Sequence, residues 1–321
     1  MELYFLPLLI RLPELRGFAV EKTGLLLLRT ALGPAIGSTT YLVADYLPPS
    51  PYWDGVFRAL PAGLLLLALH PSMPQGVWWL RSFVIGTLNI GVFFGLLFVS
   101  AQRLPGGVAA ILGAMATLVA IGFAVILLKE RVRTAQYLAA VTGVAGVALL
   151  VLRGSTSLDP VGVIAGVGSA VSLGLGLVFS RKWGRPPEVH SLTFASWTLI
   201  AGAVMLLPVA IVTEGAPPKL SLSELGGLAW VSLAGAAFAY AILLLGVQRL
   251  PVALTAPLPL INPLTAALLG WAVRHESLSF WQLVGGACVF VSVIVGTRQP
   301  KTVRQQRSPA SPVTAPEFSE T

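Results

Sequence analysis

The chain has 321 residues, of which 55% are hydrophobic and only 11% are charged. Water-soluble domains carry about 25% charged residues, so this composition excludes a soluble globular protein. The formal net charge of +8 does not indicate nucleic-acid binding, because the basic residues lie at predicted helix ends and in the tails. Apolar runs of about 20 residues, long enough to cross a bilayer, recur along the chain. They do not alternate with polar residues as a β-barrel requires, so the sequence predicts an all-α polytopic membrane protein.

The predicted elements begin after residues 1–23, whose apolar run is too short to cross a membrane and which lack the cleavage site of a secretory signal. We expect an interfacial or disordered segment there, or a start codon assigned too early. Ten apolar segments follow, bounded by proline, glycine and charge. They cover residues 26–46, 54–70, 78–101, 104–128, 134–152, 159–180, 191–213, 224–247, 251–273 and 280–297. Residues 298–321 are rich in proline, serine and arginine, which predicts a disordered cytoplasmic tail.

Ten spans place both chain ends on the same side of the membrane. If that side is the cytoplasm, most lysines and arginines fall on the inside, and the outside segments hold only Arg103, Arg153, Lys219 and Arg274. The positive-inside rule therefore predicts cytoplasmic termini in the plasma (inner) membrane. Loss of one span would put the basic segments 128–134 and 180–185 on opposite sides, so the charge pattern also favours this count.

The tetrapeptide QRLP occurs at residues 102–105 and again at 248–251. With the chain shifted by 146 positions, Glu130 also aligns with Glu276. Membrane composition does not explain matches at glutamine, arginine and glutamate, so we expect two five-helix repeats. Because five is odd, the second repeat enters the membrane in the opposite sense, as in many secondary transporters. The predicted repeats are residues 24–152 and 153–297.

Five stretches add a further likeness: GSTTYLVADYLPP (37–49), FRALPAGLLLLAL (57–69), GTLNIGVFFGLLFVSAQRLPGGVAA (86–110), LDPVGV (158–163) and KWGRP (182–186). Together they resemble the EamA family of the drug/metabolite transporter superfamily, most closely the branch named for export of indigoidine, a blue pigment. The resemblance implies ten helices in two inverted repeats and export of small metabolites such as amino acids. The chain departs from it at Ile36, where members often have tryptophan, and at Ala116 and Thr117, near a usual proline.

Charged residues near the outer end of the second predicted helix form one candidate site. Arg58 lies about one turn into this helix, where a charge usually has a partner. Asp54 lies four residues earlier on the same face, and Asp45 ends the preceding helix. These residues are candidates for a gate ion pair or for a clamp on an anionic group. The structural alternative is a snorkelling arginine with a local partner.

The ninth predicted helix contains Pro257, Pro259 and Pro263. Each proline removes a backbone donor and clashes with the preceding turn, so the freed carbonyls should face protein or a water-filled cavity. Asn262 lies in this broken stretch. We expect Asn262 to hydrogen-bond a polar substrate, as interrupted helices do in transporters; alternatively it only stabilises the kink.

Six more residues are candidates for a substrate cavity because their polar or aromatic side chains lie in otherwise apolar helices. They are Thr39, Thr40 and Tyr41 midway along the first helix, Asn89 in the third, Trp197 in the seventh and Tyr240 in the eighth. Each also fits a packing role, since threonine can bond its own helix and a buried aromatic ring can pack in a core. We expect Glu130 and Glu276, at helix ends, to be structural.

Motifs for ATP-driven transport and for zinc catalysis are absent, because the chain has no GxxxxGK[ST], HExxH or paired CxxC. Its single cysteine, Cys288, forms no intrachain disulfide, and no acidic residue lies deep in a span. We therefore expect no cofactor and no metal, and we do not expect the protein to be an enzyme.

The predicted function is a secondary transporter that exports a small organic metabolite by alternating access. It would be a monomer or homodimer that contacts small-molecule substrate and membrane lipid but no nucleic acid. A membrane receptor or a lipid-modifying enzyme is the alternative.

Overall fold

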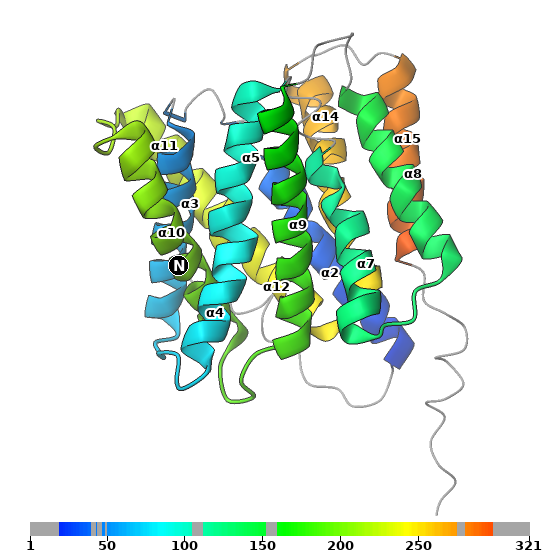
Figure 1. The fold of residues 1–321 in the computed structure, drawn as a ribbon, viewed down its shortest axis with the longest axis horizontal. Coiled ribbons are helices and arrows are strands. Elements are labelled where there is room, and N and C mark those ends of the chain that lie inside the picture. Colours follow the sequence, from blue (N-terminus) through cyan, green and yellow to red (C-terminus); the bar gives the residue numbers. More distant parts are fainter. Residues whose placement is uncertain are drawn as a thin grey trace, which may run out of the picture.

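The computed structural model describes residues 19–39, 43, 47, 48, 50–104, 112–151, 159–274 and 280–297. Within these residues the chain is helical and contains no strand (Figure 1). The predicted site residues Thr40, Tyr41 and Asp45 lie outside them, as do Glu276 and most of both tails. The helices are α2 (Ala19–Gly37), α3 (Pro51–Leu69), α4 (Trp78–Gly86), η2 (Thr87–Gly91), α5 (Val92–Arg103), α7 (Ala116–Leu128), α8 (Thr134–Val151), α9 (Pro160–Trp183), α10 (Ser191–Glu214), α11 (Leu222–Trp230), η3 (Val231–Phe238), α12 (Ala239–Arg249), α13 (Val252–Thr255), η4 (Leu258–Leu260), α14 (Ile261–Arg274) and α15 (Phe280–Gly296).

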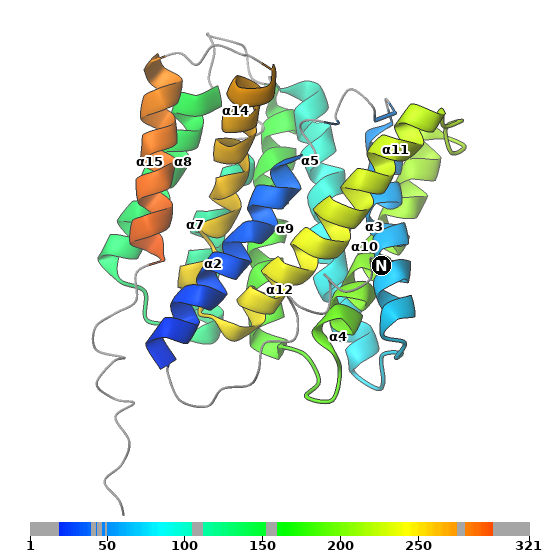
Figure 2. The same ribbon diagram turned by 180° about the vertical axis from the view of Figure 1, so that it is seen from behind.

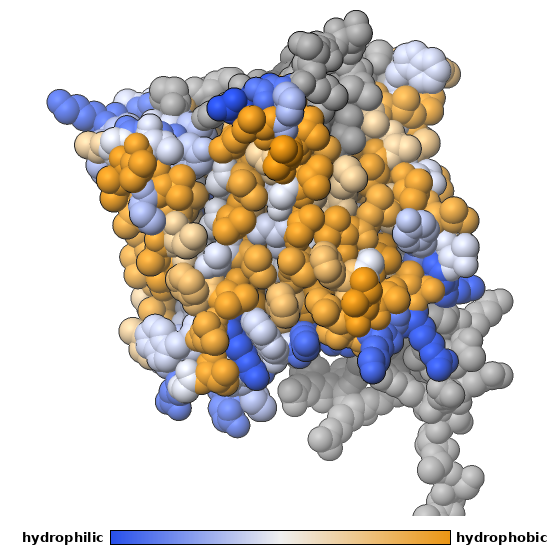
Figure 3. Space-filling model, viewed as in Figure 1, coloured by the Kyte–Doolittle hydropathy of each residue, from blue (hydrophilic) through white to orange (hydrophobic). Residues whose placement is uncertain are grey.

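The helices form an apolar bundle of membrane-protein character. Five are long and apolar enough to cross a bilayer, and the described residues contain five shorter apolar helices. Each of these helices overlaps a different predicted segment. Figure 3 shows an apolar surface across the middle of the bundle, with hydrophilic residues gathered at its two ends. The chain is therefore an all-helical polytopic membrane protein.

The first helix differs from its prediction. It begins at Ala19 rather than near residue 26, and it ends at Gly37. Thr39 consequently follows the helix instead of lying midway along it. Pro34 is inside the helix and Gly37 is its last residue; both residue types disfavour further helix, which explains the early end.

Close backbone contact joins the first helix to the second half of the chain. Seen from behind, α2 lies between α12 and α14 (Figure 2). A Cβ added at Gly33 would lie 2.6 Å from the carbonyl oxygen of Ala239 in α12. Small residues at such crossings let membrane helices approach closely. The same holds where α4 and α10 cross, since a Cβ at Gly202 would lie 2.8 Å from the carbonyl oxygen of Gly86.

Two predicted continuous helices are interrupted by π-helical segments. η2 separates α4 from α5, and η3 separates α11 from α12. Shifted by 146 positions, η2 (87–91) falls within η3 (231–238). Both helices also end alike, because Leu104 and Leu250 are extended and donate backbone N–H bonds to Ser100 and Gly246. Figure 1 shows α4–α5 running up the bundle and α11–α12 running down it.

The ninth helical stretch is broken after its first turn. α13 ends at Thr255, the η4 turn contains Pro259, and α14 begins at Ile261. Pro257 lies before η4 and packs against Gly296 of α15, where an added Cβ would lie 2.8 Å from its Cγ. The break therefore lies between α15 on one side and the centre of the bundle on the other.

Candidate functional site

A cavity of about 510 Å³ lies at the centre of the bundle. Its walls come from α2, α3, α5, the start of α7 and the residues before it, α9, the η3–α12 helix and the interrupted α13–α14 stretch. A smaller lobe of about 170 Å³ shares part of this wall. Four predicted site residues line one or both lobes: Arg58, Asn89, Tyr240 and Asn262. Pro259 and Pro263 also face the larger lobe. The volume suits a small organic molecule.

Arg58 brings a positive charge to both lobes of this cavity. Its Nη2 donates a hydrogen bond to the carbonyl oxygen of Gly235 at 3.1 Å. Its guanidinium also lies 5.6 Å from the centre of the Phe94 ring, within range of a cation–π contact. Gly235 belongs to the π-segment η3, and π-helical segments are frequent at functional sites. The arginine is thus held by a neutral carbonyl and an aromatic ring.

Arg58 and Asp54 do not form an ion pair in the structure, and the gate reading that the sequence offered for them stays a prediction. Among the described residues, the ion pairs are Arg103–Asp159 and Arg181–Glu130. Asp54 Oδ1 is buried without a hydrogen-bond partner, and Arg58 turns toward the cavity and Gly235 instead. The part of the gate hypothesis that involves Asp45 lies outside the described residues and stays a prediction.

Asn89 and Tyr240 form a polar group at the smaller lobe. Asn89 Nδ2 donates to the hydroxyl of Ser180 in α9 at 3.3 Å, while Asn89 Oδ1 is buried without a hydrogen bond. The Tyr240 hydroxyl is near Asn89 and Thr198 but makes no hydrogen bond of normal geometry. An unpaired buried polar atom costs free energy. This lobe therefore holds unused acceptor and donor capacity next to the cavity.

Asn262 connects the broken stretch to the end of α2. The hydroxyl of Ser38 donates to Asn262 Oδ1 at 3.0 Å and lies 2.8 Å from the carbonyl oxygen of Pro34. Asn262 is exposed and lines both lobes. One carbonyl near the break has a protein partner, since Thr117 donates to the carbonyl oxygen of Ala256 at 3.0 Å. Thr117 of α7 thus holds the segment between α13 and η4 in place.

Two other predicted residues do not line the cavity. The Thr39 hydroxyl donates to the carbonyl oxygen of Ile36 at 2.6 Å and accepts from the indole of Trp230 at 3.0 Å. The Trp197 indole donates to the carbonyl oxygen of Ser72 at 2.7 Å, in the turn between α3 and α4. Both side chains link separate segments of the bundle and lie away from the cavity lining. Their positions do not favour the substrate-binding role predicted for them.

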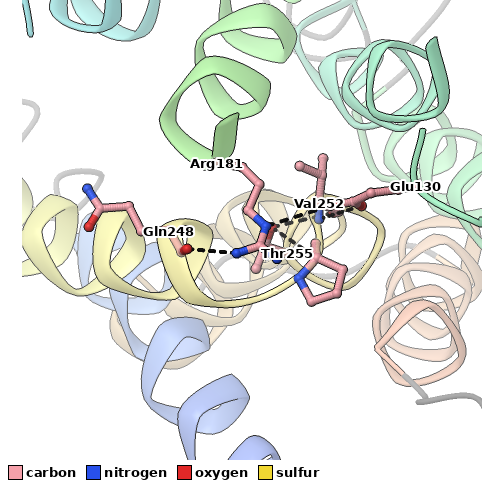
Figure 4. A network of polar contacts seen from close by, with 6 residues as sticks. Glu130, Arg181, Gln248, Val252 and Thr255 are labelled. Atoms are coloured by element: carbon pink, nitrogen blue, oxygen red, sulfur yellow. Dashed lines mark hydrogen bonds and ion pairs between the residues drawn. The ribbon is translucent and has the colours of Figure 1, made fainter. Parts of the chain in front are cut away.

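A polar network (Figure 4) lies where α9 and α12 end, at the lower end of the bundle in Figure 1. Val252 donates its backbone N–H to Glu130 Oε2 at 2.9 Å, and Arg181 Nη1 donates to the carbonyl oxygen of Gln248 at 2.8 Å. Arg181 Nε lies 3.7 Å from Glu130 Oε1. Burial raises the pKa of Glu130, although the backbone bonds and the arginine oppose this effect. We call the contacts among Glu130, Arg181, Gln248 and Val252 the inner latch.

The inner latch lies one turn beyond the cavity floor. Leu177 and Ala256 line the cavity, and each lies four residues from a latch residue, Arg181 and Val252. An apolar cluster connects the two levels, and within it Val178, Val252 and Ala256 are fully buried. This cluster, with the latch below it, separates the cavity from that end of the bundle.

The family model for EamA-like transporters matches residues 23–152 and 160–297. The chain belongs to the EamA-like transporter family. One similar protein is PecM of Dickeya dadantii (strain 3937). It is 38% identical to this chain over 264 residues, which are 82% of this chain and 89% of PecM. The Escherichia coli (strain K12) protein named uncharacterized inner membrane transporter YedA is 29% identical over 269 residues, 81% of this chain and 84% of YedA. A solved crystal structure shares the fold at a TM-score of 0.72 and 20% identity, covering 85% of this chain and 97% of that chain.

Several residues of this EamA-family site were not predicted from the sequence. Ser38 and Gly235 act through a hydroxyl and a carbonyl group that carry no distinctive sequence signal. Thr117 stood out only as a departure from the family pattern, and its bond to Ala256 was not predicted. The inner latch had a signal, because Glu130 is one of the positions matched between the repeats and the second QRLP supplies Gln248. The contact between these two distant segments of the chain could not be read from the motifs themselves.

Proposed function

We propose that this protein is a secondary transporter of the inner membrane that exports a small organic metabolite by alternating access. The observation that carries the proposal is the central cavity, with polar groups on an apolar wall and an apolar cluster and latch below it. Membership of a transporter family and a relative named as an inner membrane transporter support the same function. The protein works as a monomer or homodimer on a small-molecule substrate in lipid.

The proposed architecture is ten spans in two inverted repeats, with both termini in the cytoplasm. Three observations support it: the family model matches two segments of the chain, the π-segments η2 and η3 correspond under the 146-residue shift, and their helices run in opposite directions. Two like halves in opposite senses can exchange conformations, which opens the central site to each side in turn. Assignment to the blue-pigment branch stays a prediction.

The inner latch is the gate on the cytoplasmic side in this proposal. Glu130 belongs to the first matched segment, and Arg181, Gln248 and Val252 belong to the second. Because the latch joins the two halves, opening the cavity at this end requires its contacts to break. The structure corresponds to a state in which this side is closed.

Flux measurement on reconstituted protein tests the proposal. Proteoliposomes would be loaded with a bacterial metabolite extract, and efflux of each compound would be followed by mass spectrometry. We expect at least one small organic compound to leave faster than from protein-free liposomes, and Asn262→Ala to slow it while folded protein remains abundant. If every compound leaves both preparations at the same rate, the protein is not an exporter of such metabolites.

A further inference from the structure

The charge balance of the cavity points to a class of substrate. A guanidinium carries several N–H donors and no acceptor. Within the described residues, Arg58 has one hydrogen bond, to a neutral carbonyl, and no carboxylate within ion-pair distance. A charge held among apolar groups without a counter-ion is costly in a membrane protein. The arginine therefore has unused capacity for an anion, and it faces both lobes of the cavity.

The rest of the described wall offers no second charge. It contains no aspartate, glutamate, lysine or histidine, and Arg58 is its single ionisable group besides the Tyr240 hydroxyl. Asp54, one turn away on α3, is not part of this wall. A zwitterion such as an amino acid would bring an ammonium group with no carboxylate to receive it. A simple anion would meet its complement and leave no charge unpaired.

The apolar part of the wall is suited to a flat body. Phe93 and Phe94 line both lobes, with their ring centres 5.0 Å apart. The Phe94 ring also stacks on Phe98 at 5.7 Å, which holds it in place. Pro259 lines both lobes as well, and Asn262 contributes an exposed amide. Aromatic walls favour flat or aromatic ligands through stacking and burial.

We infer that the cavity selects organic monoanions with a flat apolar body, whose carboxylate or sulfonate pairs with Arg58 and whose body lies against Phe93 and Phe94. This inference rests on the proposed function and deepens it. Arginine suits the role, since its planar fork can bind both oxygens of an oxyanion. Asn262, on the broken stretch, supplies a neutral hydrogen-bonding group for further polar atoms of the same ligand.

Binding to matched acids and amides tests the inference. The probes are indole-3-acetate and 2-naphthoate, their neutral amides, and tryptophan as the zwitterion, measured by equilibrium dialysis against the full chain in nanodiscs. We expect the anions to bind about tenfold or more tightly than the amides and tryptophan, because a hydrogen bond to a charged group contributes more than a neutral one. Arg58→Gln should abolish this preference, and Arg58→Lys should retain part of it.

The matched control is Arg103→Gln, the same change at an arginine outside the cavity. It should leave the preference for acids unchanged. Equal affinity for acid and amide, tighter binding of tryptophan, no binding of either acid, or unaltered acid binding by Arg58→Gln would each overturn the inference. If Arg58→Gln does not fold, the inference is tested by the affinities of the wild-type protein for acids, amides and tryptophan, and by whether Arg58→Lys retains part of the preference for acids.

A flux arm separates this inference from the proposed function. Anion binding that depends on Arg58, without any flux in proteoliposomes, would overturn the transporter proposal and leave the anion site standing. Flux of neutral or zwitterionic compounds in place of the anions would keep the transporter and overturn the anion class.

Discussion

At the scale of single residues, the candidate site depends on small side chains as much as on polar ones. Asn89 fits between η2 and α9 because residue 176 is glycine: a Cβ there would overlap Asn89 Oδ1. The glycine thus allows a buried amide to reach Ser180 and the smaller lobe. The sequence predicted the asparagine as a candidate, but nothing in the sequence pairs it with Gly176.

The change Gly176→Ala is therefore expected to destabilise the protein by about 1–3 kcal/mol, the usual cost of overpacking a tight interior. Thermal or denaturant unfolding in detergent measures it. Truncating the opposing side chain in Asn89→Ala/Gly176→Ala should recover part of the loss. Gly122→Ala is the matched control, since a Cβ at that position would meet no atom within 4 Å beyond its chain neighbours and its own helix backbone. A Gly176→Ala protein as stable as the control would contradict the packing described here.

At the scale of helices, the second QRLP motif forms a contact point between elements. Its first two residues end α12 and its last two precede α13. Arg181 binds the backbone carbonyl of Gln248 in the motif, and Glu130 binds the backbone N–H of Val252 directly after it. The Arg181 and Glu130 side chains are 32% and 16% exposed, so water screens their attraction in part. We assign the latch about 1 kcal/mol of bias toward the closed lower end.

Removal of the latch carboxylate should open the lower end of the bundle more often. In a Cys288→Ala background, Leu177→Cys at the cavity floor would be labelled with a membrane-impermeant maleimide from each side of the membrane separately. Adding Glu130→Ala should speed labelling from the Glu130 side about fivefold, as expected for about 1 kcal/mol of bias.

The control for this experiment is Arg103→Ala, which breaks the other described ion pair at the opposite end of the bundle. It should not change labelling from the Glu130 side. Equal labelling with and without the Glu130 carboxylate would show that the latch is no gate.

At the scale of the whole molecule, the proposal requires one topology. Reporter insertions after residue 75, in the turn between α3 and α4, and beyond residue 297 should report the cytoplasm. An insertion after residue 217, between α10 and α11, should report the opposite side. The positive-inside pattern and an odd number of spans per half are the physical reasons. Ends of the chain found on opposite faces of the membrane would disprove the ten-span architecture.

Much of the fold could be predicted because lipid imposes simple rules on sequence. Apolar length predicts a span, and each apolar helix of the structure overlaps a predicted segment. Helix ends were less predictable: α2 begins earlier and ends earlier than expected, since apolar runs do not mark where capping and prolines stop a helix. The π-segments were not predicted, because a shifted hydrogen-bond register leaves no clear pattern in the residues.

The sequence by itself determined a helical membrane protein, its segments, its repeated motifs and several residues of its cavity wall, because bilayer burial and the cost of charge act on each segment alone. Only the tertiary structure decided the partners. In it, Arg58 binds the Gly235 carbonyl and faces the cavity instead of pairing with Asp54. Trp197 binds the Ser72 carbonyl away from the cavity wall, and Glu130 contacts Arg181 and Val252. Such contacts depend on how distant helices pack, and the spacing of residues within one helix carries no record of that packing.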